Sequence, residues 1–289
     1  MMFQDCDYIL DEEDNFWIVH KGGKEVYANR VFNVDENGDR YNALTKKKYS
    51  KVILDNFSIQ IFKGKIKRIF KPREFFKDNF EVMSLSWKKI PLALMSVGIS
   101  KENIGIFGSY MLGFEIIKDV DFIVYGLANF KIIKKNIKKI KEILHTSDIT
   151  PEHIDYQIKK YAFLYSSENQ FGKILQRNWA GIQIGKGVLS TIRFVYFNDE
   201  SPKDLFIKFG AKTILKGIVV ESEGTNFVPR IAFIDSPFGR IRILSYFWMF
   251  NSFLKKGEEI KICGDYCEEN KTIYLSDDDS WIKYLGEDC

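Results

Sequence analysis

The sequence predicts an α/β (α+β) protein in which a mixed sheet flanked by helices lies between two β-rich modules. Short apolar runs separated by turn residues fill both ends of the chain, and apolar residues recur at helical spacing in its middle part. A length of 289 residues suits two or three modules. The predicted modules are residues 1–71, 72–200 and 201–289.

In the first module, we expect strands joined by tight turns. The expected strands are Phe16–His20, Glu25–Asn33 and a hairpin of Ile59–Phe62 with Ile66–Phe70. Gly22-Gly23 and Asn37-Gly38 are typical turn residues. The basic stretch Lys46–Lys51 contains one tyrosine, and it fits either a solvated strand edge or a surface that follows a phosphate backbone.

The middle module combines helical and strand patterns. The expected helices are residues 73–80, 84–97, 128–145, 148–167 and 170–179, and Pro91 predicts either a kink or a late start in the second of them. The expected strands are 104–107, 122–125, 181–184 and 188–197. Helix 128–145 has an isoleucine-rich stripe and six lysines on its other faces. Its basic face is either simply solvated or close to a nucleotide or nucleic acid.

The centre of this module, Asn103–Gly126, carries the pattern with the most chemical content. Strand 104–107 leads into Gly108-Ser109, a short helix is expected within Tyr110–Lys118, and Asp119-Val120-Asp121 opens the next strand. Residues two apart in a strand share a face, so both carboxylates point the same way. Two such carboxylates favour a divalent cation, usually Mg²⁺ (or Mn²⁺), which in turn holds substrate phosphates.

This combination resembles the nucleotidyltransferase superfamily that includes DNA polymerase beta. The resemblance implies an enzyme that transfers a nucleoside monophosphate from a nucleoside triphosphate (NTP), with Asp119 and Asp121 as catalytic residues and magnesium ligands. Gly108 and Ser109 would cradle the β- and γ-phosphates, and Tyr110 joins them in nucleotide binding. The acceptor is left open among an RNA 3′ end, another nucleotide and a protein side chain.

The layout also resembles an archaeal-type family of predicted nucleotidyltransferases. The matching points are Asp5–Tyr8, Phe107–Ser109, Asp119–Asp121 with Val124–Gly126, and Ile192-Arg193. This second resemblance implies a β-rich segment on each side of the nucleotidyltransferase core.

The superfamily usually has a third carboxylate on a neighbouring strand, and here Thr191 occupies the matching position. Its neutral hydroxyl replaces neither a metal ligand nor a base. Three accounts follow: another carboxylate supplies the function, the substrate removes its own proton, or the site binds without turnover. The candidate carboxylates are Asp155, Glu221, Glu223 and Asp235.

Arg193 lies two residues after Thr191. It either clamps the triphosphate or forms a salt bridge with a motif aspartate.

The last module has short strands at the spacing of a small barrel or sandwich. The expected strands are Leu215–Val220, Phe227–Ile234, Arg240–Asn251, Glu259–Gly264 and Lys271–Leu275, and Trp281-Ile282 is expected to anchor the end of the module. An OB-like barrel would favour an oligonucleotide such as RNA as partner, and a structural cap is the alternative.

Two other functions are open for the chain. The first is a decayed nucleotide- or RNA-binding module. The second is an antitoxin-like protein that binds a protein partner through helix 128–145 and Arg240–Asn251.

Composition sets the remaining expectations. Hydrophobic residues make up 45% and charged residues 28% of the chain, as in globular proteins, and the net charge of +4 is compatible with an anionic substrate. Cys263 and Cys267 form a single pair, whereas structural zinc takes about four ligands. The acidic N-terminus differs from a signal peptide, and no apolar run approaches the ~20 residues of a membrane span. We therefore expect a cytoplasmic protein with reduced thiols and no membrane partner.

Overall fold

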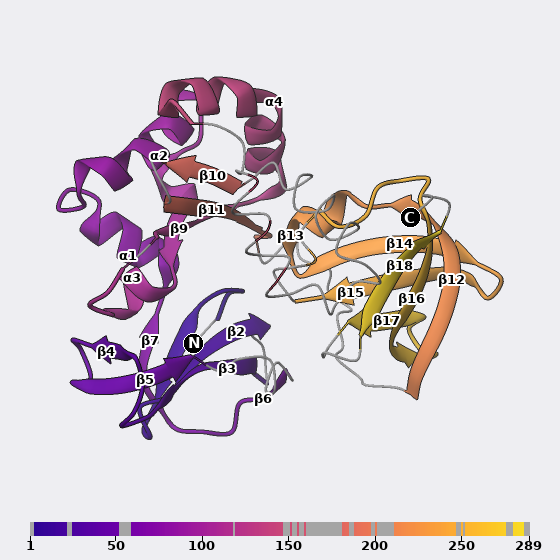
Figure 1. Cartoon of the computed structure of the whole chain (residues 1–289), viewed down its shortest axis with the longest axis horizontal. Coiled ribbons are helices and arrows are strands. Elements are labelled where there is room, and N and C mark those ends of the chain that lie inside the picture. Colours follow the sequence, from indigo (N-terminus) through magenta and orange to yellow (C-terminus); the bar gives the residue numbers. More distant parts are fainter. Residues whose placement is uncertain are drawn as a thin grey trace. The chain divides into compact units, whose positions relative to one another are not determined.

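A computed structural model (Figure 1) describes residues 3–21, 25–51, 59–117, 119–146, 181–184, 188–197, 211–246, 252–275 and 280–285, with single positions at 151, 155, 159, 200 and 250. The first of two units comprises Met1–Asp148 with Ala180–Ser201, and the second comprises Ile149–Trp179 with Pro202–Cys289. The class is mixed α+β. Strands predominate among the described residues, so helices contribute less than the sequence predicted. The helices expected at 148–167 and 170–179 lie outside the described residues.

The first unit begins with an antiparallel sheet in the order β4-β5-β3-β2-β1-β7, with β6 paired to β3. Its strands are β1 (Tyr8–Asp11), β2 (Phe16–Lys21), β3 (Tyr27–Val34), β4 (Arg40–Asn42), β5 (Lys47–Lys51), β6 (Gln60–Ile61) and β7 (Ile66–Phe70). The predicted hairpin of residues 59–70 is wrong, because β6 pairs with β3 and β7 pairs with β1. The two apolar runs, 59–62 and 66–70, therefore add strands to the first sheet instead of pairing with each other.

A second sheet in this unit has the order β10-β11-β9-β8. Its strands are β8 (Ile104–Phe107), β9 (Asp121–Tyr125), β10 (Gly181–Ile184) and β11 (Val188–Val195), and its helices are α1 (Pro72–Asn79), α2 (Leu85–Ser96), with Pro91 inside it, α3 (Ser109–Leu112) and α4 (Leu127–Leu144). α1 packs on β8 so closely that a Cβ at Gly105 would lie 2.9 Å from Pro72. On the other face, Phe130 of α4 meets Phe194 edge-on at 5.0 Å.

The short helix expected within residues 110–118 is α3, which begins one residue earlier, at Ser109. α3 ends at Leu112 because Gly113 adopts a left-handed conformation with φ 80°. The chain then turns toward the first sheet, where Phe114 is 3% exposed and its ring centroid lies 4.6 Å from that of Phe32. Beyond α3, Phe114 therefore packs among aromatic rings of the first sheet.

Five strands of the second unit close into a ring, since β12 pairs with both β14 and β16 and the order runs β12-β14-β15-β17-β16. The five ring strands are β12 (Ala211–Glu221), β14 (Arg230–Ser236), β15 (Gly239–Ser245), β16 (Glu259–Cys267) and β17 (Thr272–Leu275). The unit also contains β18 (Trp281–Leu285), which pairs with β16, and the two-residue β13 (Phe227–Val228). β15 ends at Ser245, short of the expected Asn251. A Cβ at Gly264 would lie 2.3 Å from the Tyr274 carbonyl oxygen, so the closure requires glycine there. The ring is a small barrel, and its OB-like identity stays a prediction.

Within the described residues, no helix combines the length and the apolar character that a membrane crossing requires.

Candidate functional site

The pairing of β9 with β11 brings Asp121 and Thr191 together. The two strands are parallel, and Ile192 lies opposite Phe122, which places Thr191 beside Asp121. The Thr191 hydroxyl donates a hydrogen bond of 2.5 Å to Asp121 Oδ1. A neutral hydroxyl therefore occupies the strand position at which the resemblance implies a third carboxylate.

Asp119 and Asp121 flank Val120, which is fully buried. Asp121 begins β9 and is half-buried, whereas Asp119 precedes the strand and is exposed as a whole residue. Partial burial of its carboxyl group, followed by the charge of Asp121, raises the pKa of Asp119. The positive charges of Lys51 and Arg40 act in the opposite direction. The two carboxylates thus lie close enough to repel each other, as the sequence suggested.

The Gly-Ser turn runs directly past this pair of carboxylates. Gly108 has φ 77°, a conformation that favours glycine, and a Cβ at this position would lie 3.4 Å from Asp121 Oδ2. Register pairs Phe107 with Asp121 across β8 and β9, so the turn begins at the level of the carboxylate. Ser109 Oγ accepts a hydrogen bond of 3.1 Å from Arg40 Nη1. The structure therefore brings together Gly108, Ser109, Asp119 and Asp121.

Tyr110 lies beside the turn but packs between helices. Its ring meets Trp87 edge-on at 5.1 Å and Phe75 at 5.7 Å, and burial raises the pKa of its hydroxyl. This packing accounts for the residue without a ligand. Its role in nucleotide binding stays a prediction.

Arg193 stacks on the ring of Phe107, with its Cζ 4.3 Å from the ring centroid. Within the described part of the chain, no ion pair within 4.0 Å joins it to Asp119 or Asp121. The charge of Arg193 nevertheless acts on Tyr8 of β1. Burial raises the pKa of the Tyr8 hydroxyl well above its usual range. The positive charge of Arg193 opposes this rise, and the negative charge of Asp121 adds to it. Arg193 therefore faces the first sheet beneath the motif.

Sequence reasoning missed three residues that the first sheet contributes: Tyr8, Arg40 and Lys51. Lys51 belongs to the basic stretch 46–51, whose composition fits a surface that follows a phosphate backbone, but Arg40 lies outside that stretch. Tyr8 belongs to the segment Asp5–Tyr8, which matches the archaeal-type family without an assigned role. All three approach the motif through tertiary packing, which local patterns do not encode.

The four alternative carboxylates all belong to the second unit. Glu221 ends β12, Glu223 begins the short 3₁₀ helix Glu223–Asn226, Asp235 lies in β14, and Asp155 is one of the singly described positions. Among the residues that the structure describes, no group of three or more His, Cys, Asp or Glu is arranged to hold a metal ion.

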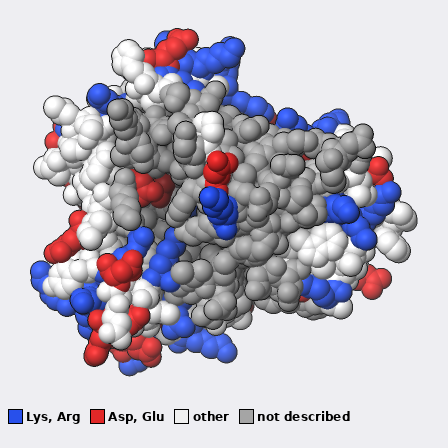
Figure 2. Space-filling view, viewed as in Figure 1, with Lys and Arg blue, Asp and Glu red and all other residues white. Residues whose placement is uncertain are grey.

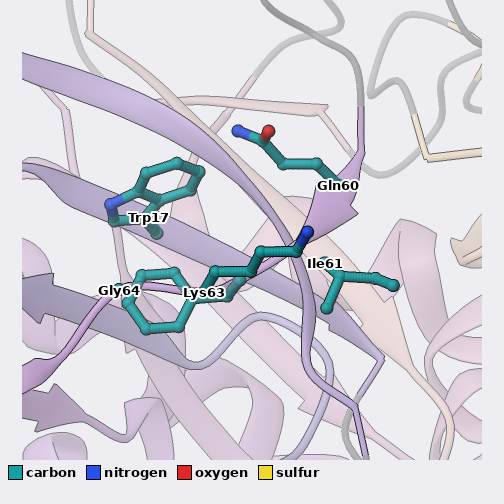
Figure 3. A pocket seen from close by; sticks show the side chains of 6 residues that line it. Trp17, Gln60, Ile61, Lys63 and Gly64 are labelled. Atoms are coloured by element: carbon teal, nitrogen blue, oxygen red, sulfur yellow. The ribbon is translucent and has the colours of Figure 1, made fainter.

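A pocket of about 390 Å³ opens elsewhere in the first sheet (Figure 3), lined by Trp17, Gln60, Ile61, Phe62, Lys63 and Gly64. The Trp17 indole N–H donates a hydrogen bond of 2.7 Å to Asp11 Oδ2, and its ring meets Phe62 edge-on at 5.4 Å. None of the residues predicted to bind nucleotide or metal lines this pocket.

No family model matches the chain, and no curated protein matches it.

Proposed function

We propose that this chain is a metal-dependent nucleotidyltransferase that moves a nucleoside monophosphate from an NTP to an acceptor. The observation that carries the proposal is the convergence of Asp119 and Asp121 with the turn Gly108-Ser109. Two carboxylates fit Mg²⁺ (or Mn²⁺), which typically binds through one or two carboxylates plus substrate phosphates and waters. A cation between them would also offset the burial, and then the repulsion by Asp121, that raise the pKa of Asp119.

When bound, the metal would neutralise charge that develops on the phosphates during transfer. Asp119 and Asp121 would fix its position, while the Ser109 hydroxyl and the backbone at Gly108 would orient the β- and γ-phosphates. In the transfer, a bond forms between an acceptor oxygen and the α-phosphorus, the bond from that phosphorus to the β-bridging oxygen breaks, and pyrophosphate leaves. Thr191 donates a hydrogen bond to Asp121, and its neutral hydroxyl provides no base, so the acceptor proton would pass to a substrate phosphate or to water.

A specific observation favours a second candidate, a nucleotide- or RNA-binding module without turnover. The hydrogen bond from Thr191 engages one oxygen of Asp121 at the place where a third acidic ligand would stand. Such a module would bind NTP in a metal-dependent manner and release no pyrophosphate.

RNA is the acceptor that the surface supports best. Exposed lysines line one side of α4 at helical spacing, at positions 131, 134, 135, 138 and 139, and Figure 2 shows Lys and Arg side chains gathered over this helix. A cytoplasmic setting is part of the proposal, in keeping with the reduced thiols that the sequence predicts. The antitoxin-like alternative would instead use this helix for a protein partner, and a stable protein that co-purifies would favour it.

The test is pyrophosphate release with each NTP in turn, Mg²⁺ or Mn²⁺, and total RNA as acceptor. The double variant Asp119→Asn with Asp121→Asn keeps the side-chain volume and removes both charges, and Glu115→Gln, at a nearby exposed carboxylate, is the matched control. We expect release by the wild type and by Glu115→Gln, and none by the double variant. Silence of all three, with NTP binding that depends on the two aspartates, would favour the binding module.

A further inference from the structure

Two cationic side chains of the first sheet lie on the face that meets the motif. In the sheet, Arg40 pairs with Tyr49 and Lys51 pairs with Phe32. Opposed residues of paired strands, and residues two apart in one strand, share a face. Arg40 and Lys51 therefore lie on the same face, and the Arg40 guanidinium stacks over the Phe32 ring with its Cζ 5.5 Å from the centroid.

Backbone and side-chain hydrogen bonds hold β4 against the segment that follows the Gly-Ser turn. The Asn42 side chain donates to the Leu112 carbonyl at 2.8 Å, the Ala43 N–H to the Gly113 carbonyl at 2.9 Å, and the Glu115 N–H to the Tyr41 carbonyl at 3.1 Å. Phe114 fills the space beneath, buried among aromatic rings. The contacts of Tyr41, Asn42 and Ala43, which directly follow Arg40, thus fix the position of Arg40 relative to Ser109.

Arg40 retains most of its hydrogen-bonding capacity. A guanidinium has five N–H donors. In the described part of the chain its hydrogen bond goes to Ser109 Oγ, and no carboxylate lies within 4.0 Å of it. Lys51 shares the face of the first sheet from which Arg40 reaches Ser109, so both cations lie on the side that meets the motif. A fork of donors beside a Gly-Ser turn and two metal-binding carboxylates has the geometry and charge to hold a phosphate chain.

We propose that Arg40, assisted by Lys51, binds the β- and γ-phosphates of the NTP, so that the first sheet supplies the triphosphate clamp. The inference rests on the proposed nucleotide site and adds to it the residues that select a triphosphate. It assigns this role to Arg40 in place of Arg193, whose guanidinium stacks on Phe107 and faces Tyr8.

The test is calorimetric titration of the full chain in Mg²⁺ with three probes: an NTP whose α–β bridge cannot be cleaved, the corresponding monophosphate, and inorganic tripolyphosphate. The variants are Arg40→Ala, Arg40→Gln and Lys51→Ala. Lys48→Ala is the matched control, because this exposed lysine of β5 lies on the opposite face. We expect Arg40→Ala and Arg40→Gln to weaken binding of the NTP and tripolyphosphate about 10- to 100-fold, Lys51→Ala to weaken it less, and monophosphate affinity to change under about 2-fold.

Two arginine variants are used so that the test still stands if one of them fails to fold. Thermal melting of each variant identifies one that is unfolded. Equal losses for NTP and monophosphate would mean that Arg40 merely supports the fold, and would overturn the inference. Unchanged NTP affinity in the Arg40 and Lys51 variants, with loss in the Asp119→Asn/Asp121→Asn double variant, would overturn it while the proposed function stands. Failure of the wild type to bind any of the three probes would overturn both.

Discussion

At the scale of single residues, Thr191 determines how much negative charge the candidate site carries. Its hydroxyl approaches Asp121 as a hydrogen-bond donor, and it leaves two carboxylates where three are implied. A third charge in this place would repel Asp121 unless a cation were present.

Thr191→Asp should therefore make the stability of the first unit depend on metal. Without metal, we expect a loss of up to about 1 kcal/mol from like charges on adjacent strands, or a fall of about 2–4 °C in the melting temperature. Mg²⁺ should restore it, and pyrophosphate release should rise. Thermal melting in EDTA and in Mg²⁺ tests this, with Thr191→Asn as the uncharged control. Identical melting of all three proteins in both conditions would contradict the idea.

Asp7 should make stability depend on pH in a different way. It is 4% exposed, and burial raises its pKa from 3.8 to about 6, although its Oδ2 accepts the Gln4 N–H at 3.0 Å. The folded state therefore binds this proton more tightly than the unfolded state, and stability falls as pH rises from about 4 through 6. Above that range the charged form costs up to about 3 kcal/mol.

Asp7→Asn keeps an oxygen acceptor for Gln4 and removes the charge. We expect the variant to be more stable than the wild type at pH 8 and equal to it near pH 4, measured by denaturant unfolding. A difference that is the same at both pH values would rule out titration of Asp7 as its source.

How much of the site the sequence reveals depends on distance along the chain. Gly108, Ser109, Asp119 and Asp121 stand within fourteen positions, so their spacing alone predicts a shared site. Arg40 reaches Ser109 across a separation of 69 residues, and no local period links the two. Such contacts follow from packing of the first sheet, which the sequence does not display.

At the scale of elements, the segment after α3 connects the two sheets of the first unit. Phe114→Ala should remove the contacts that hold β4 and β5 against the motif, and we expect it to cost about 3–5 kcal/mol. Urea unfolding measures the effect. Phe238→Ala, at a phenylalanine that is 68% exposed in the second unit, is the control and should change stability little. Equal effects of the two variants would show that Phe114 does not support the docking.

Helix α4 carries the prediction that concerns RNA. Lys131→Ala with Lys138→Ala removes two exposed charges from one side of the helix, whereas Lys77→Ala with Lys89→Ala removes two exposed lysines elsewhere in the unit. If α4 contacts RNA phosphates, the first pair should lower the slope of log affinity against log salt by about 1.5. Filter binding with a single-stranded RNA at several salt concentrations tests this, and equal slopes for the two pairs would remove α4 from the RNA surface.

Elements were predicted best where one pattern governs them. α1, α2 and α4 begin and end within one or two residues of expectation, because apolar residues recur at helical spacing in them and because Pro72 starts α1 and Gly98 follows α2. The wrongly predicted hairpin at 59–70 shows the opposite case. There the two apolar runs pair with earlier strands, β3 and β1, which the local pattern does not reveal.

At the scale of the whole molecule, the two units have separate cores and should unfold separately. Ile262 of β16 is fully buried in the barrel, so Ile262→Ala should cost the second unit about 2–5 kcal/mol. Calorimetry should show two transitions, one lowered by Ile262→Ala and the other by Phe114→Ala. A single transition that both variants lower equally would mean that the units unfold as one.

Hydrogen bonds join Ala43 to Gly113 and Glu115 to Tyr41, and they tie the first sheet to the segment that follows the Gly-Ser turn. These bonds limit how small a segment of this chain could be transferred to another protein and keep the candidate site intact. A gene fusion that transplanted residues 72–200 alone would carry the two aspartates and the Gly-Ser turn. It would leave Arg40 and Lys51 behind and uncover Phe114. Any recombination that preserves the chemistry should therefore move the first sheet with the motif, as a single heritable piece.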